Sequence, residues 1–453
     1  MASGFIDHPL ARRADEVVVQ TFRHFVPHPE DRMPITRKSW VSSVILLWIL
    51  GCLARRPNTY WIRLAFFPVV FLSCVHVGFA HRKRLPGTDE SDYAWGHIWL
   101  TCAFRAIDLG LYKRKGELRI GEVEPGKLKT SANGHKSNGI HPSANGNGHS
   151  KVHAEQTNSN PSLWRTLLEG LAVILNQRGI GWEDGKDIYL KPESRDTGRR
   201  WKWLLQTSWK SVQCFLFLDF LDSTFKLLPG FDKPRGATIF AFGRNPIEKY
   251  FISCVLSFMT GLSIIRLFGL LYHICSLVGV GLLFHPPASW PPLFDNPCSR
   301  TSMHDFWSRG WHQFLRRAVL VLGRPLESLF GFPGLVIGSF ITSGFYHSWG
   351  LYTAAGGPDY QNLIYFTVQP LAFLFERLYR RITGRRLGGF LGGVWVYLWI
   401  VVGAQWCINA WHARGYLKGI LIPPRLSPTQ RILFPALTPL APYLRPFFYV
   451  DSA

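Results

Sequence analysis

Long runs of apolar residues constrain the fold of this chain more than any other feature of its sequence. A helix needs about 20 such residues to cross the hydrocarbon core of a bilayer. Blocks of roughly that length occur at residues 40–54, 60–80, 93–112, 250–284, 326–346, 360–376 and 388–411. The block 250–284 is too long for one perpendicular span, so we expect it to be tilted or to break in two, with Arg266 marking the break. We predict an all-α integral membrane protein with about seven to nine transmembrane helices.

The composition also favours a membrane-embedded chain. Hydrophobic residues make up 47% of the sequence and charged residues 18%, whereas roughly 25% of an average soluble protein is charged. The net charge of +22 could indicate nucleic-acid binding. However, the basic residues stand in short runs between apolar blocks, as at Arg55-Arg56, Arg82-Lys83-Arg84, Arg380-Arg381 and Arg385-Arg386. Such runs are typical of loops facing anionic lipid, so we expect membrane lipid as a partner and exclude nucleic acid.

The same patterning divides the chain into regions. The polar segment 1–39 lacks the apolar core of a signal peptide, so we expect insertion to begin at an internal span. Segment 113–162 is repetitive and almost free of large apolar residues, which predicts a disordered insertion. The other regions are the first transmembrane helices at 40–112, amphipathic or interfacial helices at 163–250, a second membrane region at 251–415 and a C-terminal tail at 416–453. The cysteines form no C-x-x-C pair, and we expect no metal site.

Region 163–250 combines apolar and charged residues at helical spacing. Residues 163–175 form an amphipathic pattern, and Trp201 and Trp209 then stand among Arg and Lys, as in helices at the level of lipid headgroups. Asp219 and Asp222 are three residues apart, on one helix face, as a general acid/base pair would require. We favour the alternative that they are exposed carboxylates at a helix end.

Ionisable residues inside apolar blocks are costly to bury in lipid, so each is a functional candidate. Arg105 and Asp108 lie three residues apart and can neutralise each other, and Arg63 can extend to the membrane interface. The remaining candidates are His76, His273 and His347. The last has small and hydroxyl-bearing neighbours, from Ser343 to Gly350, which allow close approach of another helix or a substrate.

A second feature precedes His347 along the chain. The stretch Asp305-Phe306-Trp307-Ser308-Arg309-Gly310-Trp311-His312-Gln313 mixes aromatic and polar side chains. One interpretation is an interfacial anchor at a helix end. In the other, Arg309, His312 and Gln313 point into a protein-lined cavity that the aromatic residues shield from lipid.

The pairing of Phe306-Trp307-Ser308-Arg309-Gly310-Trp311-His312 with His347, 35 positions later, resembles the membrane-bound O-acyltransferase superfamily and within it the wax synthase-like branch. The segments Tyr93-Ala94-Trp95-Gly96 and Arg178-Gly179-Ile180-Gly181-Trp182 add to the resemblance. It implies helices around an internal acyl-transfer tunnel, with acyl-CoA entering from the cytosol and a hydrophobic alcohol from the membrane. The essential histidine of the family corresponds to His347 and its second polar position to His312. Ser308-Arg309-Gly310 replaces the commoner Gly-Arg-Arg.

The resemblance implies acyl transfer from acyl-CoA, with His347 as general base and His312 or Gln313 stabilising the oxyanion. Trp307, Arg309, Trp311, Gln313 and Ser343 are the expected substrate-binding residues. We favour acetyl-CoA as co-substrate, no permanently bound cofactor, and a terpenoid hydroxyl as acceptor, in the endoplasmic reticulum membrane. The alternatives are a long-chain wax ester synthase and a non-catalytic transporter, and the oligomeric state stays open. Because the sequence contains no G-x-S-x-G motif, we expect direct transfer without an acyl-enzyme.

Overall fold

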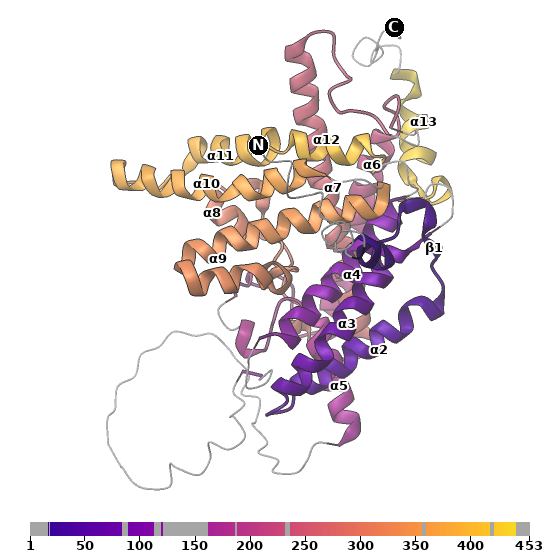
Figure 1. Cartoon of the computed structure of the whole chain (residues 1–453). Helices are drawn as coiled ribbons and strands as arrows, with labels where there is room; N and C mark the ends of the chain where they lie inside the picture. Colours follow the sequence, from indigo (N-terminus) through magenta and orange to yellow (C-terminus); the bar gives the residue numbers. More distant parts are fainter. Residues whose placement is uncertain are drawn as a thin grey trace, which may run out of the picture.

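The computed structural model is almost entirely helical (Figure 1). It describes residues 17, 19–83, 89–112, 119–120, 162–185, 188–231, 236–355, 359–416 and 421–440. Within these residues the strands are β1 (Met33–Pro34) and β2 (His81–Arg82), which pair in parallel. The expectation of an all-α protein is therefore confirmed. Apart from residues 119, 120 and 162, the predicted insertion 113–162 lies outside the described part of the chain.

Five helical stretches of the described chain are long and apolar enough to cross a membrane. They are α2 (Arg37–Ala54), α3 (Tyr60–Ala80), α7 (Pro246–Gly281), α9 (Arg316–Ala355) and the run of α11 (Gly389–Tyr397), η7 (Leu398–Val402) and α12 (Gln405–Ala413). This number is below the seven to nine expected. Three further long helices, α4 (Asp89–Gly110), α6 (Arg200–Phe225) and α10 (Tyr360–Thr383), are not among these candidate spans.

The remaining elements are short. The amphipathic helix α5 (Leu163–Leu175) matches the predicted boundaries, and it buries Gly170, Val173 and Ile174. The others are η1 (Pro29–Asp31), η3 (Glu183–Gly185), η4 (Pro287–Ser289), η5 (Pro297–Ser299), α8 (Met303–Asp305), η6 (Phe306–Gly310), η8 (Pro424–Leu426), η9 (Thr429–Leu433), α13 (Phe434–Leu437) and η10 (Thr438–Leu440).

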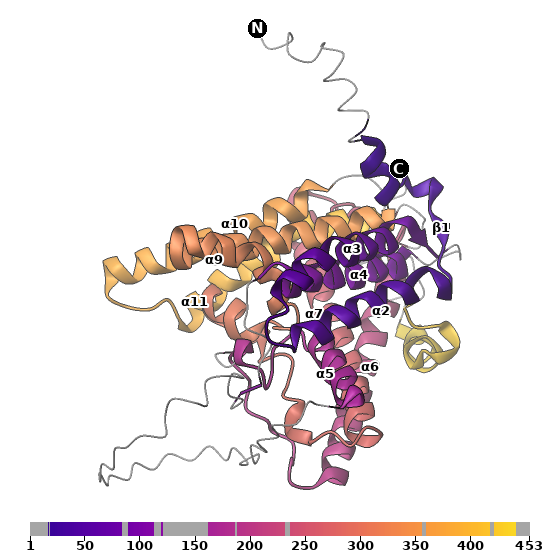
Figure 2. The same cartoon turned by 60° about the horizontal axis from the view of Figure 1, so that its bottom comes forward.

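Helix α4 occupies a central position in the helical packing. It contacts α3 and α2 on one side and α9 on the other, while α9 also packs along α10 and α6 packs along α7. Figures 1 and 2 show α2, α3 and α4 side by side, next to the layer formed by α9 and α10. Residues on α4 and α9 are therefore brought together although they are far apart in the sequence.

Two predicted spans differ from their expected form. Residues 250–281 of the stretch 250–284 belong to one continuous helix, α7, so Arg266 marks no break. The Arg266 guanidinium lies over the Phe217 ring, 4.7 Å from its centroid. In contrast, the predicted span 326–346 is interrupted, because Gly331 adopts φ 65° and ψ −154° inside α9. A side chain at Gly323 or Gly338 would collide with the opposite arm of α9. The two arms therefore fold back on each other as a hairpin.

A buried ionic cluster joins α4 to α9. The predicted Arg105–Asp108 pair is present, and both side chains are almost fully buried. Asp108 also accepts hydrogen bonds from Arg317 at 3.2 Å and Arg324 at 3.3 Å. Asp184 contributes a second carboxylate, 3.0 Å from Arg317. The cluster fixes the beginning of α9 against the end of α4.

Three other charged residues differ from expectation. Arg63 does not extend to the interface: it is 2% exposed and donates a hydrogen bond to the Leu109 carbonyl. Asp219 and Asp222, expected at the surface, are 0% and 3% exposed. They are buried because the segment after residue 421 covers the end of α6, where the Thr429 backbone N–H donates to Asp219 at 2.8 Å.

Candidate active site

His347 lies in the second arm of α9, where α4, α10 and α12 meet. Its ring is stacked on Phe366 of α10, with centroids 4.6 Å apart and planes 9° from parallel. The ring centroid of Trp411, on α12, lies 5.8 Å from that of His347. Ser343 lies one helical turn before His347, on the same face of the arm. The aromatic neighbours fix the orientation of the imidazole.

Helix α4 places two polar side chains beside His347. The Tyr93 hydroxyl lies 3.4 Å from His347 Nδ1, and the His97 ring lies 5.7 Å from the His347 ring. His97 Nδ1 must carry a proton, because it donates to the Tyr93 carbonyl at 2.8 Å. His97 Nε2 is buried and has no hydrogen-bond partner among the described residues. His97 was not recognised from the sequence, although it follows Tyr93 by one helical turn.

Glycines make this close approach of α4 and α9 possible. A Cβ at Gly350 of α9 would overlap the His97 ring, and a Cβ at Gly96 of α4 would overlap the Thr353 side chain. Small residues allow two helix backbones to approach more closely than larger ones do. The glycines therefore bring His97 and Tyr93 within reach of His347.

The segment from Trp307 to Gln313 forms a second side of the site. Trp307 donates from Nε1 to Gln369 at 3.2 Å and packs against Phe366, the ring on which His347 is stacked. His312 lies between Phe268 and Phe294, with ring centroids 5.2 and 5.7 Å away. The His312 ring also contacts Trp311, with centroids 5.4 Å apart, and Trp311 contacts Trp307. The two histidines expected from the sequence are therefore connected through one set of aromatic rings.

His312 is an uncharged, unsatisfied polar group. Its Nδ1 atom is buried without a hydrogen-bond partner in the described part of the chain. Burial, and then the nearby positive charge of Arg178, lower the pKa of His312 to about 4. The imidazole is therefore neutral near pH 7, and its ring carries one N–H donor and one acceptor.

The other predicted residues of this segment have different environments. Trp311 is stacked on Phe306 with centroids 5.6 Å apart, so it belongs to the packed interior. Gln313 donates from Nε2 to the Ser308 carbonyl at 2.6 Å, while its Oε1 is buried and has no partner among the described residues. The Arg309 side chain is 56% exposed, and its guanidinium lies 3.6 Å from the Asp305 carboxylate.

Arg309 and Gln313 border a pocket with an excess of positive charge. Its lining includes Arg178, Tyr189, Lys191, Phe294, Arg309 and Gln313. Asp295 supplies negative charge and pairs with Lys191 at 3.2 Å. The Arg178 guanidinium is 6% exposed and bonds to the carbonyls of Pro291 and Pro292, with no carboxylate partner among the described residues. A buried cation with no matching anion is costly, so this pocket favours an anionic ligand.

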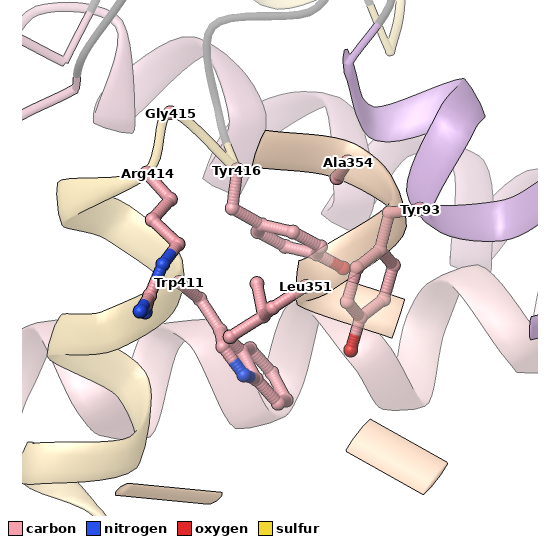
Figure 3. A pocket seen from close by; sticks show the side chains of 7 residues that line it. All are labelled: Tyr93, Leu351, Ala354, Trp411, Arg414, Gly415 and Tyr416. Atoms are coloured by element: carbon pink, nitrogen blue, oxygen red, sulfur yellow. The ribbon is translucent and has the colours of Figure 1, made fainter. Parts of the chain in front are cut away.

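A second pocket has three aromatic side chains in its lining (Figure 3). Its lining includes Tyr93, Leu351, Ala354, Trp411, Arg414 and Tyr416. Tyr93 and Trp411 also contact His347, so this pocket borders the same histidine.

The segment that carries the predicted motif also matches a known family. Residues 290–368 match the model of the membrane bound O-acyl transferase family. Over this segment the chain is related to that family. The matched segment contains every predicted site residue from Trp307 to His347, whereas Tyr93, His97 and Trp411 lie outside it. The candidate site thus combines residues of the matched segment with residues from helices outside it.

The chain is also similar to curated fungal acetyltransferases. Acetyltransferase TRI7 of Fusarium sporotrichioides is 26% identical over 285 residues, covering 52% of this chain and 62% of the relative. Acetyltransferase eriL of Hericium erinaceus is 23% identical, covering 53% and 65%, and acetyltransferase atnC of an Arthrinium species is 25% identical, covering 55% and 64%. The chain therefore spans less than two thirds of the length of each. No solved structure shows significant similarity to it.

Proposed function

We propose that this chain transfers an acyl group from acyl-CoA to a hydroxyl of a hydrophobic alcohol, with His347 as general base. The observation that carries the proposal is the position of His347, which lies in the O-acyl transferase segment with its Nδ1 facing the Tyr93 hydroxyl. No hydrogen bond of His347 Nε2 is recorded in the described part of the chain. When Nδ1–H donates to Tyr93, the lone pair on Nε2 can accept a proton.

The reaction then needs no covalent enzyme intermediate. His347 Nε2 removes the proton from the alcohol as its oxygen attacks the thioester carbonyl carbon. The carbonyl oxygen becomes an oxyanion, which His312 stabilises by donating a hydrogen bond from its neutral ring. As the oxyanion collapses, the carbon–sulfur bond breaks, and the CoA sulfur takes the proton from His347. The products are the ester and free CoA.

The basic pocket supports acyl-CoA as the donor. Its cations, Arg178, Lys191 and Arg309, suit the phosphate groups of CoA. The buried Gln313 Oε1 offers a hydrogen-bond acceptor to an amide N–H of the pantetheine arm. This pocket adjoins His312, because Phe294 lines the pocket and contacts the His312 ring. The thioester would then lie near the oxyanion donor.

We further propose that the acyl group is acetyl and that the acceptor is a terpenoid-type natural product. The support is the printed description of the relatives as acetyltransferases. Membranes containing the chain should therefore use acetyl-CoA in preference to palmitoyl-CoA when both compete for one polycyclic alcohol. Esters can be quantified by mass spectrometry, with His347→Ala membranes as the blank. A predominance of the palmitoyl ester would establish the wax synthase alternative, since a long tunnel gains about 0.8 kcal/mol for each buried methylene.

Tyr93 has a predicted positioning role in this mechanism. Tyr93→Phe removes the hydroxyl that accepts Nδ1–H of His347, so the imidazole loses the partner that fixes its tautomer. We expect kcat to fall about tenfold, the equivalent of one hydrogen bond, while the KM for acyl-CoA is unchanged. Tyr365→Phe is the matched control, because Tyr365 lies beside Phe366 and its hydroxyl has no recorded hydrogen bond in the described chain. Equal kcat values for the two variants would exclude the positioning role.

A further inference from the structure

The segment ahead of α2 packs across the ends of other helices. We call residues 19–36 the N-terminal strap; they lie outside the family-matched segment. The strap contains β1, which pairs with β2 directly after α3. Its His24 and Phe25 rings also contact His76 of α3, with centroids 6.0 and 6.3 Å away. The strap is therefore fixed to α3 and β2 at several points.

Arg32 of the strap caps the end of α9. Its guanidinium donates to the carbonyl oxygen of Tyr352, at 3.2 Å, and to that of Thr353. Both carbonyls belong to the last turn of α9, where backbone oxygens have no partner within the helix. A cation at this position also opposes the negative end of the helix dipole. Because Arg32 is only 2% exposed, water competes little for these hydrogen bonds.

The last turn of α9 meets the beginning of α4 at the same place. The Thr353 hydroxyl lies 3.4 Å from the carbonyl oxygen of Asp92, the residue before Tyr93. Leu351 and Ala354, on either side of the residues that Arg32 holds, line one small pocket together with Tyr93 (Figure 3). The position of Tyr93 therefore depends on where the last turn of α9 lies.

The hydrogen bond between Tyr93 and His347 spans this junction. His347 lies in the same arm of α9 as Thr353, less than two helical turns before it. The Tyr93 hydroxyl is 3.4 Å from His347 Nδ1, close to the longest distance at which a hydrogen bond forms. A shift of a few tenths of an ångström between α4 and α9 would therefore break it.

We propose that Arg32 is a positioning residue for acyl transfer, which holds the last turn of α9 against α4 and so keeps His347 within hydrogen-bond distance of Tyr93. This inference rests on the proposed role of His347 as general base. It gives the N-terminal strap a part in the reaction. No strap residue lines the basic pocket in the described part of the chain, so Arg32 should not affect the binding of acyl-CoA.

The test is a double-mutant cycle with Arg32→Gln and Tyr93→Phe. Arg32→Gln should lower kcat by about fivefold to tenfold, close to the loss predicted for Tyr93→Phe, with an unchanged KM for acyl-CoA. Because Arg32 acts through the Tyr93–His347 hydrogen bond, kcat of the double variant should lie within about twofold of that of Tyr93→Phe alone. Arg37→Gln is the matched control and should keep the wild-type kcat, because Arg37 is exposed and follows the strap directly.

A conservative variant extends the cycle. Arg32→Lys keeps the positive charge but lacks the planar fork that reaches both carbonyls, so its kcat should lie between those of the wild type and Arg32→Gln. It replaces Arg32→Gln in the cycle if the latter does not fold. Losses that multiply in the double variant would show a general structural role and overturn the proposal. A wild-type kcat for both Arg32 variants would overturn it too, as would a change in the KM for acyl-CoA alone.

Amide hydrogen exchange of the solubilised full chain gives a second readout, which needs no turnover. Arg32→Gln should speed exchange in peptides from the last turn of α9 and the first turns of α4, whereas Arg37→Gln should not. Equal exchange in the wild type and Arg32→Gln would overturn the hold of Arg32 on this junction. If the wild type forms no ester but Arg32→Gln still speeds this exchange, the acyl-transfer proposal fails while the hold on the junction stands.

Discussion

His347→Ala is expected to lower the rate of acyl transfer by about 10²–10⁴-fold, the usual contribution of a general base. An alcohol is a poor nucleophile until its proton is removed. We assign this step to His347, whose ring is held in place by stacking on Phe366. Ester formation from radiolabelled acetyl-CoA, in membranes with equal amounts of wild-type and variant protein, measures the loss. Retention of the rate within about tenfold would contradict the general-base role.

A control separates loss of catalysis from loss of folding. His304 lies in the same family-matched segment but is exposed, so His304→Ala should keep wild-type activity. His347→Gln keeps most of the side-chain volume and should be as inactive as His347→Ala, with normal expression. An active His347→Gln variant would indicate that His347 acts by packing rather than by accepting a proton.

Asp108→Asn is expected to cause the largest loss of stability. The substitution removes the negative charge that Arg105, Arg317 and Arg324 share, and the first two of these arginines are only 1–2% exposed. Breaking a buried ion pair leaves a buried charge without compensation and typically costs about 3–5 kcal/mol. We expect a lower melting temperature of the solubilised protein and reduced expression.

The matched control for this variant is a surface ion pair. Asp196 lies 3.4 Å from Lys202, and both side chains are partly exposed, at 28% and 42%. Because solvent screens such a pair, Asp196→Asn should leave the melting temperature close to that of the wild type. Equal melting temperatures for Asp108→Asn and Asp196→Asn would contradict the view that the buried cluster holds α4 against α9.

Local patterns predicted the helices well where each helix depends on its own residues. The predicted span 60–80 coincides with α3, and the amphipathic segment 163–175 coincides with α5. Bilayer-length apolar runs and helical periodicity are properties of neighbouring residues, so they are readable from the sequence. The break in α9 also had a local signal, because Gly331 is followed by Pro333, but the apolar run obscured it.

Only part of the candidate site could be predicted from local sequence patterns. Trp307, His312 and His347 lie within one segment of recognisable sequence, and the structure places them around one set of aromatic rings. Tyr93 is 254 residues away from His347 along the chain, and its hydrogen bond to Nδ1 depends on how α4 packs against α9. No local pattern could have paired them.

The sequence by itself determined the helical membrane-protein class, most helix boundaries and the segment that carries His347, because hydropathy and motifs are local properties. Tertiary packing decided which charges are buried and which side chains meet. The sequence around Asp219 and Asp222 predicted exposed carboxylates at a helix end, but in the folded chain residues after 421 cover both side chains. Likewise, Gly96 and Gly350 let α4 and α9 approach each other closely enough to bring His97 beside His347. Burial and proximity depend on contacts between distant segments, and these exist only once the chain has folded.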